Sequence, residues 1–123
     1  MEPCNTAFPV ALKADHYCHH APYGGLTEAN LQLMVLRNGP AVIAIHATDA
    51  LRFLKGEPWT GGCFSDRSKV NHAVLLVGWD ANYWIAKNSW SDQWGINGYL
   101  YLPRGVNKCA VQTVVAVPIV TKV

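Results

Sequence analysis

The chain has 123 residues, of which 50% are hydrophobic and 15% are charged, and its formal net charge is +2. This length suits one domain or part of one, and the apolar content excludes an intrinsically disordered chain. The Lys and Arg residues are scattered, which argues against a nucleic-acid surface, and no apolar run reaches the roughly 18 residues of a membrane span. We expect a single domain over residues 1–123, with neither a nucleic-acid nor a membrane partner.

The N-terminal segment contains three prolines and shows no sustained periodicity. We expect residues 1–25 to form an irregular, disulfide-anchored entry segment. They lack the basic start and apolar stretch of a signal peptide, so either the chain is cytosolic or Met1 marks an artificial start or a processing boundary. The cysteines Cys4, Cys18, Cys63 and Cys109 favour the second alternative, because an even count suggests two disulfides and an oxidising compartment. Four cysteines allow three pairings.

The first regular elements are predicted after residue 26. Thr27 is a good N-cap and Gly39-Pro40 a stop signal, so residues 28–38 are predicted to form a helix. The β-rich run at residues 41–47 predicts a buried strand. A short helix at residues 49–55 and a long surface loop over residues 56–70 follow.

The remainder of the chain is dominated by strand patterns. Short runs rich in β-branched and aromatic residues, separated by turn signals, predict strands at residues 72–79, 83–87, 98–102 and 113–117. Strands at such short spacing form an antiparallel sheet or barrel. The fold class is therefore α+β, mostly β, with one main helix towards the N-terminal side.

A cluster of His16, Cys18, His19 and His20 could ligate zinc. Zinc motifs usually bring two ligand pairs separated by a longer loop, and adjacent His19 and His20 point in different directions in an extended chain. We therefore favour a solvated loop over a metal site, and we expect no metal and no cofactor.

Two segments carry a resemblance to a known family. They are residues 71–79, NHAVLLVGW, and residues 87–99, KNSWSDQWGINGY. Together they resemble the histidine and asparagine segments of papain-like cysteine proteases. The resemblance implies the antiparallel β-barrel-like, right-hand domain of the papain fold for essentially the whole chain.

The resemblance covers the C-terminal half of that family only. In the papain family the nucleophilic cysteine lies in a C-G-[SA]-C-[WY] context, with the histidine and asparagine roughly 130–150 residues downstream. The segment that precedes His72 is much shorter than this spacing, and it contains no such motif. The oxyanion-hole glutamine of the family has no counterpart either, since Gln32 falls within the predicted helix.

The resemblance also implies roles for individual residues. His72 would be the imidazole base, Asn88 the group that orients it, and Trp90 and Trp94 the indoles that shield their contact. Cys63 and Cys109 occupy positions that match a family disulfide. Cys4 and Cys18 would then pair with each other or with cysteines of an absent segment.

Four further positions would line the pocket for the substrate side chain second from the scissile bond. By the resemblance these are Asn71, Ala73, Ala44 and Val114. All but Asn71 are small or apolar, and none is acidic, so we expect a hydrophobic preference there.

These observations favour the C-terminal half of a cysteine endopeptidase. Its partner would be an N-terminal papain-like half that carries the nucleophilic cysteine, and its substrate a peptide or protein. The chain alone should be inert, and the disulfides favour a lysosomal or secreted location. The alternative is a non-catalytic papain-like module for interaction or assembly.

Overall fold

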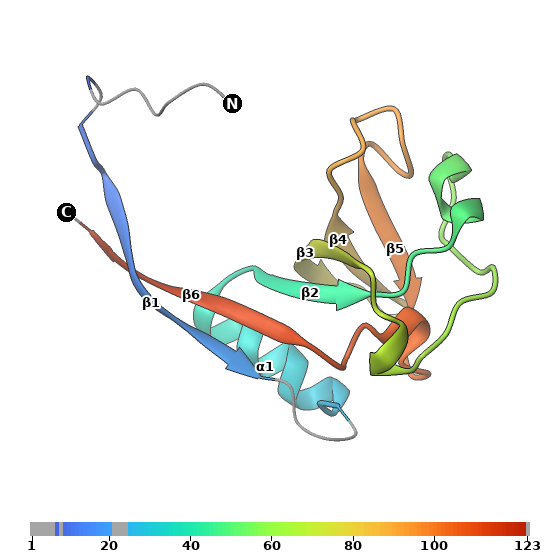
Figure 1. The fold of residues 1–123 in the computed structure, drawn as a ribbon, viewed down its shortest axis with the longest axis horizontal. Helices are drawn as coiled ribbons and strands as arrows, with labels where there is room; N and C mark the ends of the chain where they lie inside the picture. Colours follow the sequence, from blue (N-terminus) through green and yellow to red (C-terminus); the bar gives the residue numbers. More distant parts are fainter. Residues whose placement is uncertain (1–6, 8, 21–24, 123) are drawn as a thin grey trace.

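The computed structural model describes residues 7, 9–20 and 25–122 (Figure 1). Its strands form one six-stranded antiparallel sheet in the order β1-β6-β2-β3-β4-β5. The strands are β1 (Leu12–His20), β2 (Ala41–Ile45), β3 (His72–Trp79), β4 (Tyr83–Lys87), β5 (Tyr99–Pro103) and β6 (Val115–Lys122). The helices are α1 (Glu28–Asn38) and the 3-10 turns η1 (Asp49–Phe53), η2 (Arg67–Lys69) and η3 (Lys108–Ala110).

Helix α1 has the ends that the sequence predicts. The Thr27 side chain accepts a hydrogen bond from the Asn30 backbone N–H at 3.1 Å, which satisfies a donor of the first turn. At the other end Gly39 adopts φ +83°, and its N–H donates to the Val35 carbonyl. This positive φ, which glycine adopts without strain, ends the helix at the predicted position.

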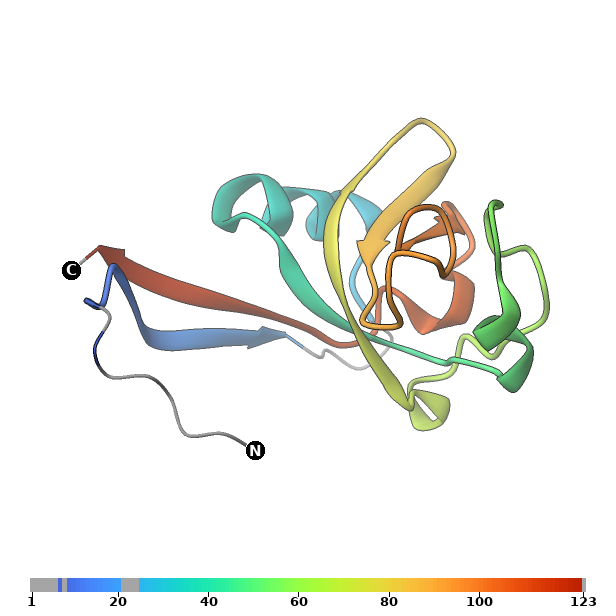
Figure 2. The same cartoon turned by 90° about the horizontal axis from the view of Figure 1, so that it is seen from above.

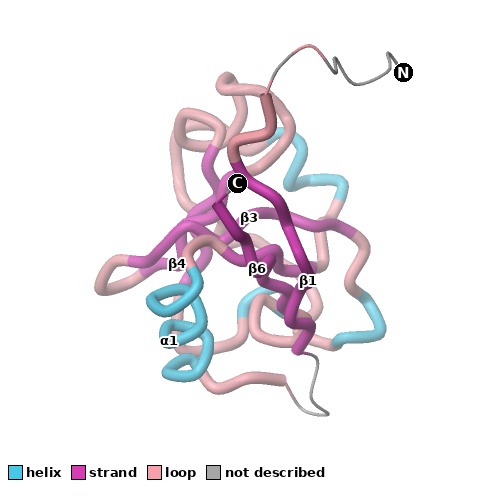
Figure 3. Tube along the Cα trace, turned by 90° about the vertical axis from the view of Figure 1, so that its left-hand side faces the viewer, coloured by secondary structure: helices cyan, strands magenta, loops and turns pink. Residues whose placement is uncertain are grey.

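Helix α1 covers one face of the sheet. It contacts β2, β3 and β6, and Figure 3 shows it lying to one side of the strands. Its buried residues Leu31 and Val35 belong to the same core as Ile43, Leu76 and Val115 of those strands. The opposite sheet face is open in the described part of the chain, where Val42 remains 44% exposed.

The expectation of a mostly β fold with one α-helix is confirmed, but the sheet is not a closed barrel. Strands β1 and β5 lie at its two edges. The strands from His72 onward begin at or close to their predicted starts. The last one, β6, runs to Lys122 and is longer than predicted. The strand predicted at residues 41–47 ends at Ile45, because the Asn71 side chain takes both backbone hydrogen bonds of Ala47.

The expectation for residues 1–25 is wrong in its central part. Residues 12–20 form β1, which pairs with β6 from Leu12↔Lys122 to His20↔Val115. Every side chain of β1 is exposed, so the sequence has no alternation of apolar and polar residues that would predict a strand. Backbone hydrogen bonds to β6 stabilise β1 instead. Figure 2 shows this two-stranded ribbon projecting from the body of the domain.

Among the described cysteines, two form a disulfide and one has a free thiol. Cys63 and Cys109 form a disulfide with a Cα–Cα distance of 5.1 Å, as the resemblance implied. Cys18 has a free, exposed thiol, so no disulfide anchors β1 at that position. Cys4 lies outside the described residues. None of the helices in the described ranges has the length and hydrophobicity needed to span a bilayer.

Candidate active site

His72 and Asn88 come together because β3 and β4 are neighbours in the sheet. His72 is the first residue of β3 and lies opposite Ile45 of β2. Asn88 directly follows β4, and its backbone N–H donates to the Gly98 carbonyl at 3.1 Å. Backbone hydrogen bonds of the sheet therefore fix the positions of His72 and Asn88 independently of their side-chain contacts.

The two side chains are joined by a hydrogen bond. His72 Nε2 lies 2.8 Å from Asn88 Oδ1. The same oxygen accepts the Ser89 backbone N–H at 2.8 Å, which identifies it as the carbonyl oxygen and not the amide nitrogen. His72 must therefore donate through Nε2–H, which leaves the lone pair of neutral His72 on Nδ1. The geometry selects the imidazole tautomer and fixes the ring plane.

Two indoles cover this contact. The Trp90 ring is stacked on the His72 ring, with centroids 4.7 Å apart and planes at 24°. Trp94 meets Trp90 edge-on at 5.2 Å, and its Nε1–H donates to the buried Leu51 carbonyl at 2.9 Å. The two indoles, called the lid below, thus place an apolar wall against one face of the His72 ring.

A glycine is required beside the lid. Gly95 adopts φ +59°, and a Cβ atom there would lie 2.5 Å from the Tyr99 carbonyl oxygen. The Gly95 N–H donates to the Leu54 carbonyl, so the chain passes close to η1 at this point. The Trp94-Gly95 pair of the sequence therefore has a structural reason, since only glycine fits this approach.

The comparisons with known proteins agree with this geometry. The family model described as papain family cysteine protease matches residues 2–119. The chain belongs to the papain family of cysteine proteases. It is 39% identical over 88 residues to a viral cathepsin of Heliothis zea nuclear polyhedrosis virus and 39% identical over 97 residues to pro-cathepsin H of Mus musculus. Those alignments cover 68% and 75% of this chain but only 23% and 29% of the relatives.

A solved structure supports the same assignment. The digestive procathepsin L2 proteinase from Tenebrio molitor larval midgut superposes with a TM-score of 0.71 and 33% identity. The match covers 86% of this chain and 34% of that structure. This papain-family domain therefore corresponds to about a third of the related protease.

Three of the four predicted pocket residues of the papain-family domain lie together. Ala44 of β2 is the register partner of Ala73 of β3, and its N–H donates to the Val114 carbonyl at 3.1 Å. A hollow of about 330 Å³ lies next to them, lined by Val42, Ala73 and Asn88 among others. The surface of this hollow is mainly apolar, although Lys87, Asn88 and Ser89 also line it.

The fourth predicted pocket residue, Asn71, holds the backbone. Its Oδ1 accepts the Ala47 N–H at 2.8 Å, and its Nδ2 donates to the Ala47 carbonyl at 3.0 Å. These two bonds use the polar groups of the side chain and anchor the residue just before His72. These bonds tie the backbone at Asn71, and so the start of β3 at His72, to the chain that follows β2.

Arg52 lies beside His72 although no sequence motif points to it. Arg52, Asn71, His72 and Trp90 help line a hollow of about 250 Å³ beside the imidazole. Arg52 lies on η1, well before His72 in the sequence, and no motif marks it. The sequence predicts a short helix here but not where that helix lies in the fold. Only the folded structure therefore shows that Arg52 is next to His72.

Neither a thiol nor a metal site accompanies the pair in the described residues. Cys63 and Cys109 are bonded to each other, and Cys18 lies on the edge strand β1, separated from β3 by β6 and β2. No group of three His, Cys, Asp or Glu side chains in that part of the chain is arranged to hold a metal ion. The candidate zinc cluster around Cys18 therefore does not assemble among the described residues.

Proposed function

We propose that His72 and Asn88 are the base and the orienting amide of a cysteine endopeptidase whose thiol lies on a separate or missing N-terminal segment. The observation that carries this proposal is the 2.8 Å hydrogen bond beneath the Trp90 ring. A bond from Nε2 to an acceptor leaves Nδ1 free to take a proton, as a thiol protease requires. An amide, unlike a carboxylate, orients the ring without adding a negative charge.

The proposed reaction uses His72 twice. The thiol of the partner transfers its proton to Nδ1, which gives a thiolate and an imidazolium. The thiolate attacks the scissile carbonyl carbon, and the imidazolium returns the proton to the leaving amine as the C–N bond breaks. Water then adds to the thioester, His72 accepts one of its protons, and the acid is released with regeneration of the thiol.

The lid supports the charged state of this cycle. Trp90 presents its ring face to the imidazole at 4.7 Å, and an aromatic face attracts a cation. It also limits water access to the bond between Nε2 and Oδ1. The ring contact and the restricted access of water both help the imidazole to keep its orientation while it holds the proton.

Substrate choice on one side of His72 follows from the alanines and valine described above. We propose that Ala44, Ala73 and Val114 form the floor for the side chain second from the scissile bond. The surface offers no carboxylate there among the described residues, so aliphatic and aromatic side chains are preferred over Arg. The Oδ1 and Nδ2 atoms of Asn71 are already hydrogen-bonded to Ala47, so Asn71 can border this pocket without requiring a polar substrate side chain.

The partner and location belong to the same proposal. The open sheet face and the fraction of the relatives that this chain covers support an N-terminal papain-like half as the companion. The Cys63–Cys109 disulfide supports a lysosomal or secreted location. A non-catalytic assembly module is the rival, favoured by the absence of a thiol next to His72 in the described residues.

Reconstitution separates the two functions. The chain is mixed with a recombinant N-terminal half of a papain-family protease, and complex formation is followed by native mass spectrometry. Hydrolysis of a fluorogenic peptide with Leu second from the bond, together with labelling by a thiol-directed epoxide, then reports activity. We expect His72→Ala to lower both rates by about 10²–10⁴-fold.

The control is His16→Ala, which removes an exposed histidine of β1 and should leave hydrolysis unchanged. A complex that forms but labels and cleaves equally with and without His72 would refute the endopeptidase and favour the module.

A further inference from the structure

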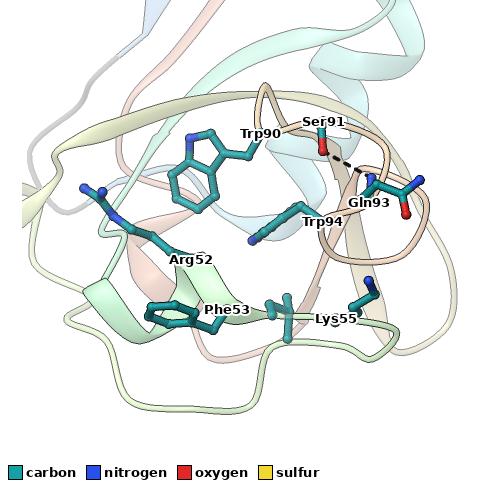
Figure 4. Close-up of a pocket in the computed structure, with 8 residues that line it drawn as sticks. Arg52, Phe53, Lys55, Trp90, Ser91, Gln93 and Trp94 are labelled. Atoms are coloured by element: carbon teal, nitrogen blue, oxygen red, sulfur yellow. Dashed lines mark hydrogen bonds between the residues drawn. The ribbon is translucent and has the colours of Figure 1, made fainter.

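A cationic, aromatic groove lies beside the His72–Asn88 pair. It has a volume of about 520 Å³ and runs between η1 and the loop after β4. Figure 4 shows Arg52 and Lys55 towards opposite ends, with the Trp94 ring between them and Phe53 along one side. The Phe53 side chain is 85% exposed, so it walls the groove without packing into the core.

The charge of this groove has one sign. Its lining contains two cations, and none of the described residues that line it is acidic. The nearest partner of Arg52 is Asp49, at 3.9 Å, and both side chains are largely exposed, at 71% and 101% of their reference areas. Asp92, next to the groove, receives a hydrogen bond from Gln93. A long exposed pair such as Asp49–Arg52 is worth little, so the Arg52 guanidinium remains free to bind another carboxylate.

The groove is continuous with the site of the proposed chemistry. Arg52 and Trp90 line both the groove and the hollow at His72, and the exposed Asp49 also lines that hollow. An extended peptide that lies across the imidazole therefore passes Arg52 and then reaches Lys55. The apolar hollow at Ala73 shares no lining residue with the groove, so the same peptide meets it away from the two cations.

We propose that this groove binds the leaving-group side of an extended peptide and selects acidic side chains there. The inference rests on the proposed function for the direction in which the peptide runs, because that proposal assigns the acyl side of the substrate to the apolar hollow. Trp94 and Phe53 provide contact area for the peptide stem, and the two cations pair with Asp or Glu side chains. The preferred substrate is then apolar before the scissile bond and acidic after it.

Binding to the chain itself tests the charge preference. The probes are acetyl-Ala-Leu-Gly-Ala-Glu-Glu-amide and its Gln-Gln and Lys-Lys counterparts, titrated while the indole N–H signals of Trp90 and Trp94 are followed by NMR. We expect the Glu-Glu peptide to bind about fivefold more tightly than the Gln-Gln peptide, since exposed ion pairs have small effects. Near 1 M salt, where the Debye length is about 3 Å, the difference should vanish.

Charge reversal supplies the matched control. Arg52→Glu or Lys55→Glu should shift the preference towards the Lys-Lys peptide. Lys13→Glu makes the same change of charge on the exposed strand β1 and should retain the preference for Glu-Glu. Equal affinity for all three peptides, or equal effects of Arg52→Glu and Lys13→Glu, would overturn the proposal.

The reconstituted enzyme distinguishes this inference from the proposed function. Hydrolysis that depends on His72 but has the same kcat/KM for the Glu-Glu and Gln-Gln peptides would overturn the groove assignment and leave the endopeptidase standing. Selective binding of the Glu-Glu peptide without hydrolysis in the complex would support the groove and refute the endopeptidase. A larger kcat/KM for the Glu-Glu peptide, lost in Arg52→Glu, supports both.

Discussion

Replacement of Trp94 by Phe tests how the lid is held. Trp94 is 5% exposed, and its Nε1–H donates to the carbonyl of Leu51, a residue with no exposed surface. Phe keeps an aromatic ring but removes this hydrogen bond, while the Leu54 backbone N–H still donates to the same carbonyl at 3.1 Å. Loss of one hydrogen bond from an acceptor that keeps a second donor costs about 0.5–1.5 kcal/mol, in addition to the loss of ring volume.

Trp84→Phe provides the matched comparison. Trp84 is 1% exposed, and its Nε1 is buried without a hydrogen-bond partner in the structure. Its contacts with Trp79 and Arg104 are made by ring faces and edges, which Phe partly keeps. Trp84→Phe therefore removes a similar ring volume but no hydrogen bond.

Urea unfolding measures the difference between the two variants. We expect the free energy of unfolding of Trp94→Phe to lie about 0.5–1.5 kcal/mol below that of Trp84→Phe, with the same denaturant slope. The variant at 94 should also lose the stacking of Trp90 on His72, seen as weaker nuclear Overhauser contacts between the two rings. If Trp84→Phe proves as destabilising as Trp94→Phe, the hydrogen bond to Leu51 does not hold the lid as we argue.

Three other predictions follow from the disulfide, the amide and one capping carboxylate. The Cys63→Ala/Cys109→Ala double variant, which opens a loop of 46 residues, should lose about 4 kcal/mol of unfolding free energy in urea; a loss below about 1 kcal/mol would contradict this. Asn88→Ala should lower hydrolysis by the reconstituted enzyme about 10²-fold without weakening the complex, and unchanged hydrolysis would exclude an orienting role. Hydrogen bonds from the backbone and side chain of Ser68 lower the pKa of Asp66 below its usual 3.8, so its stabilisation is complete above pH 3.8 and is lost as the pH falls through the lower folded-state pKa. Asp66→Asn should therefore reduce the dependence of the urea midpoint on pH in that acidic range, and an unchanged dependence would contradict the cap.

The strands around the site were predictable because their apolar residues alternate with others or form short runs, as strands with one or two buried faces require. Strand β3 presents apolar side chains to α1 and to the core, β4 presents them to the core, and turn signals bound both strands closely. Strand β1 was not predictable by the same reasoning. Its side chains are all exposed, and its stability comes from backbone pairing with a segment near the other end of the chain, which leaves no periodic trace.

The candidate site divides in the same way. His72, Asn88 and the two indoles lie in segments whose sequences resemble a family, so their meeting could be expected. The groove could not, because Arg52 and Lys55 come from η1 and its end whereas Ser91 and Gln93 come from the loop after β4. Sites assembled by tertiary structure from exposed residues of unrelated segments have no contiguous signature.

The pairing of β1 with β6 also sets an order of events during synthesis. Leu12 is translated long before Lys122, its register partner. In a nascent chain emerging from the ribosome, β1 therefore lacks its partner strand until β6, residues 115–122, has left the exit tunnel. Throughout that interval the unpaired amides of β1 are open to any other extended polypeptide, and a chaperone or companion domain that occupies them would protect the newborn molecule from aggregation.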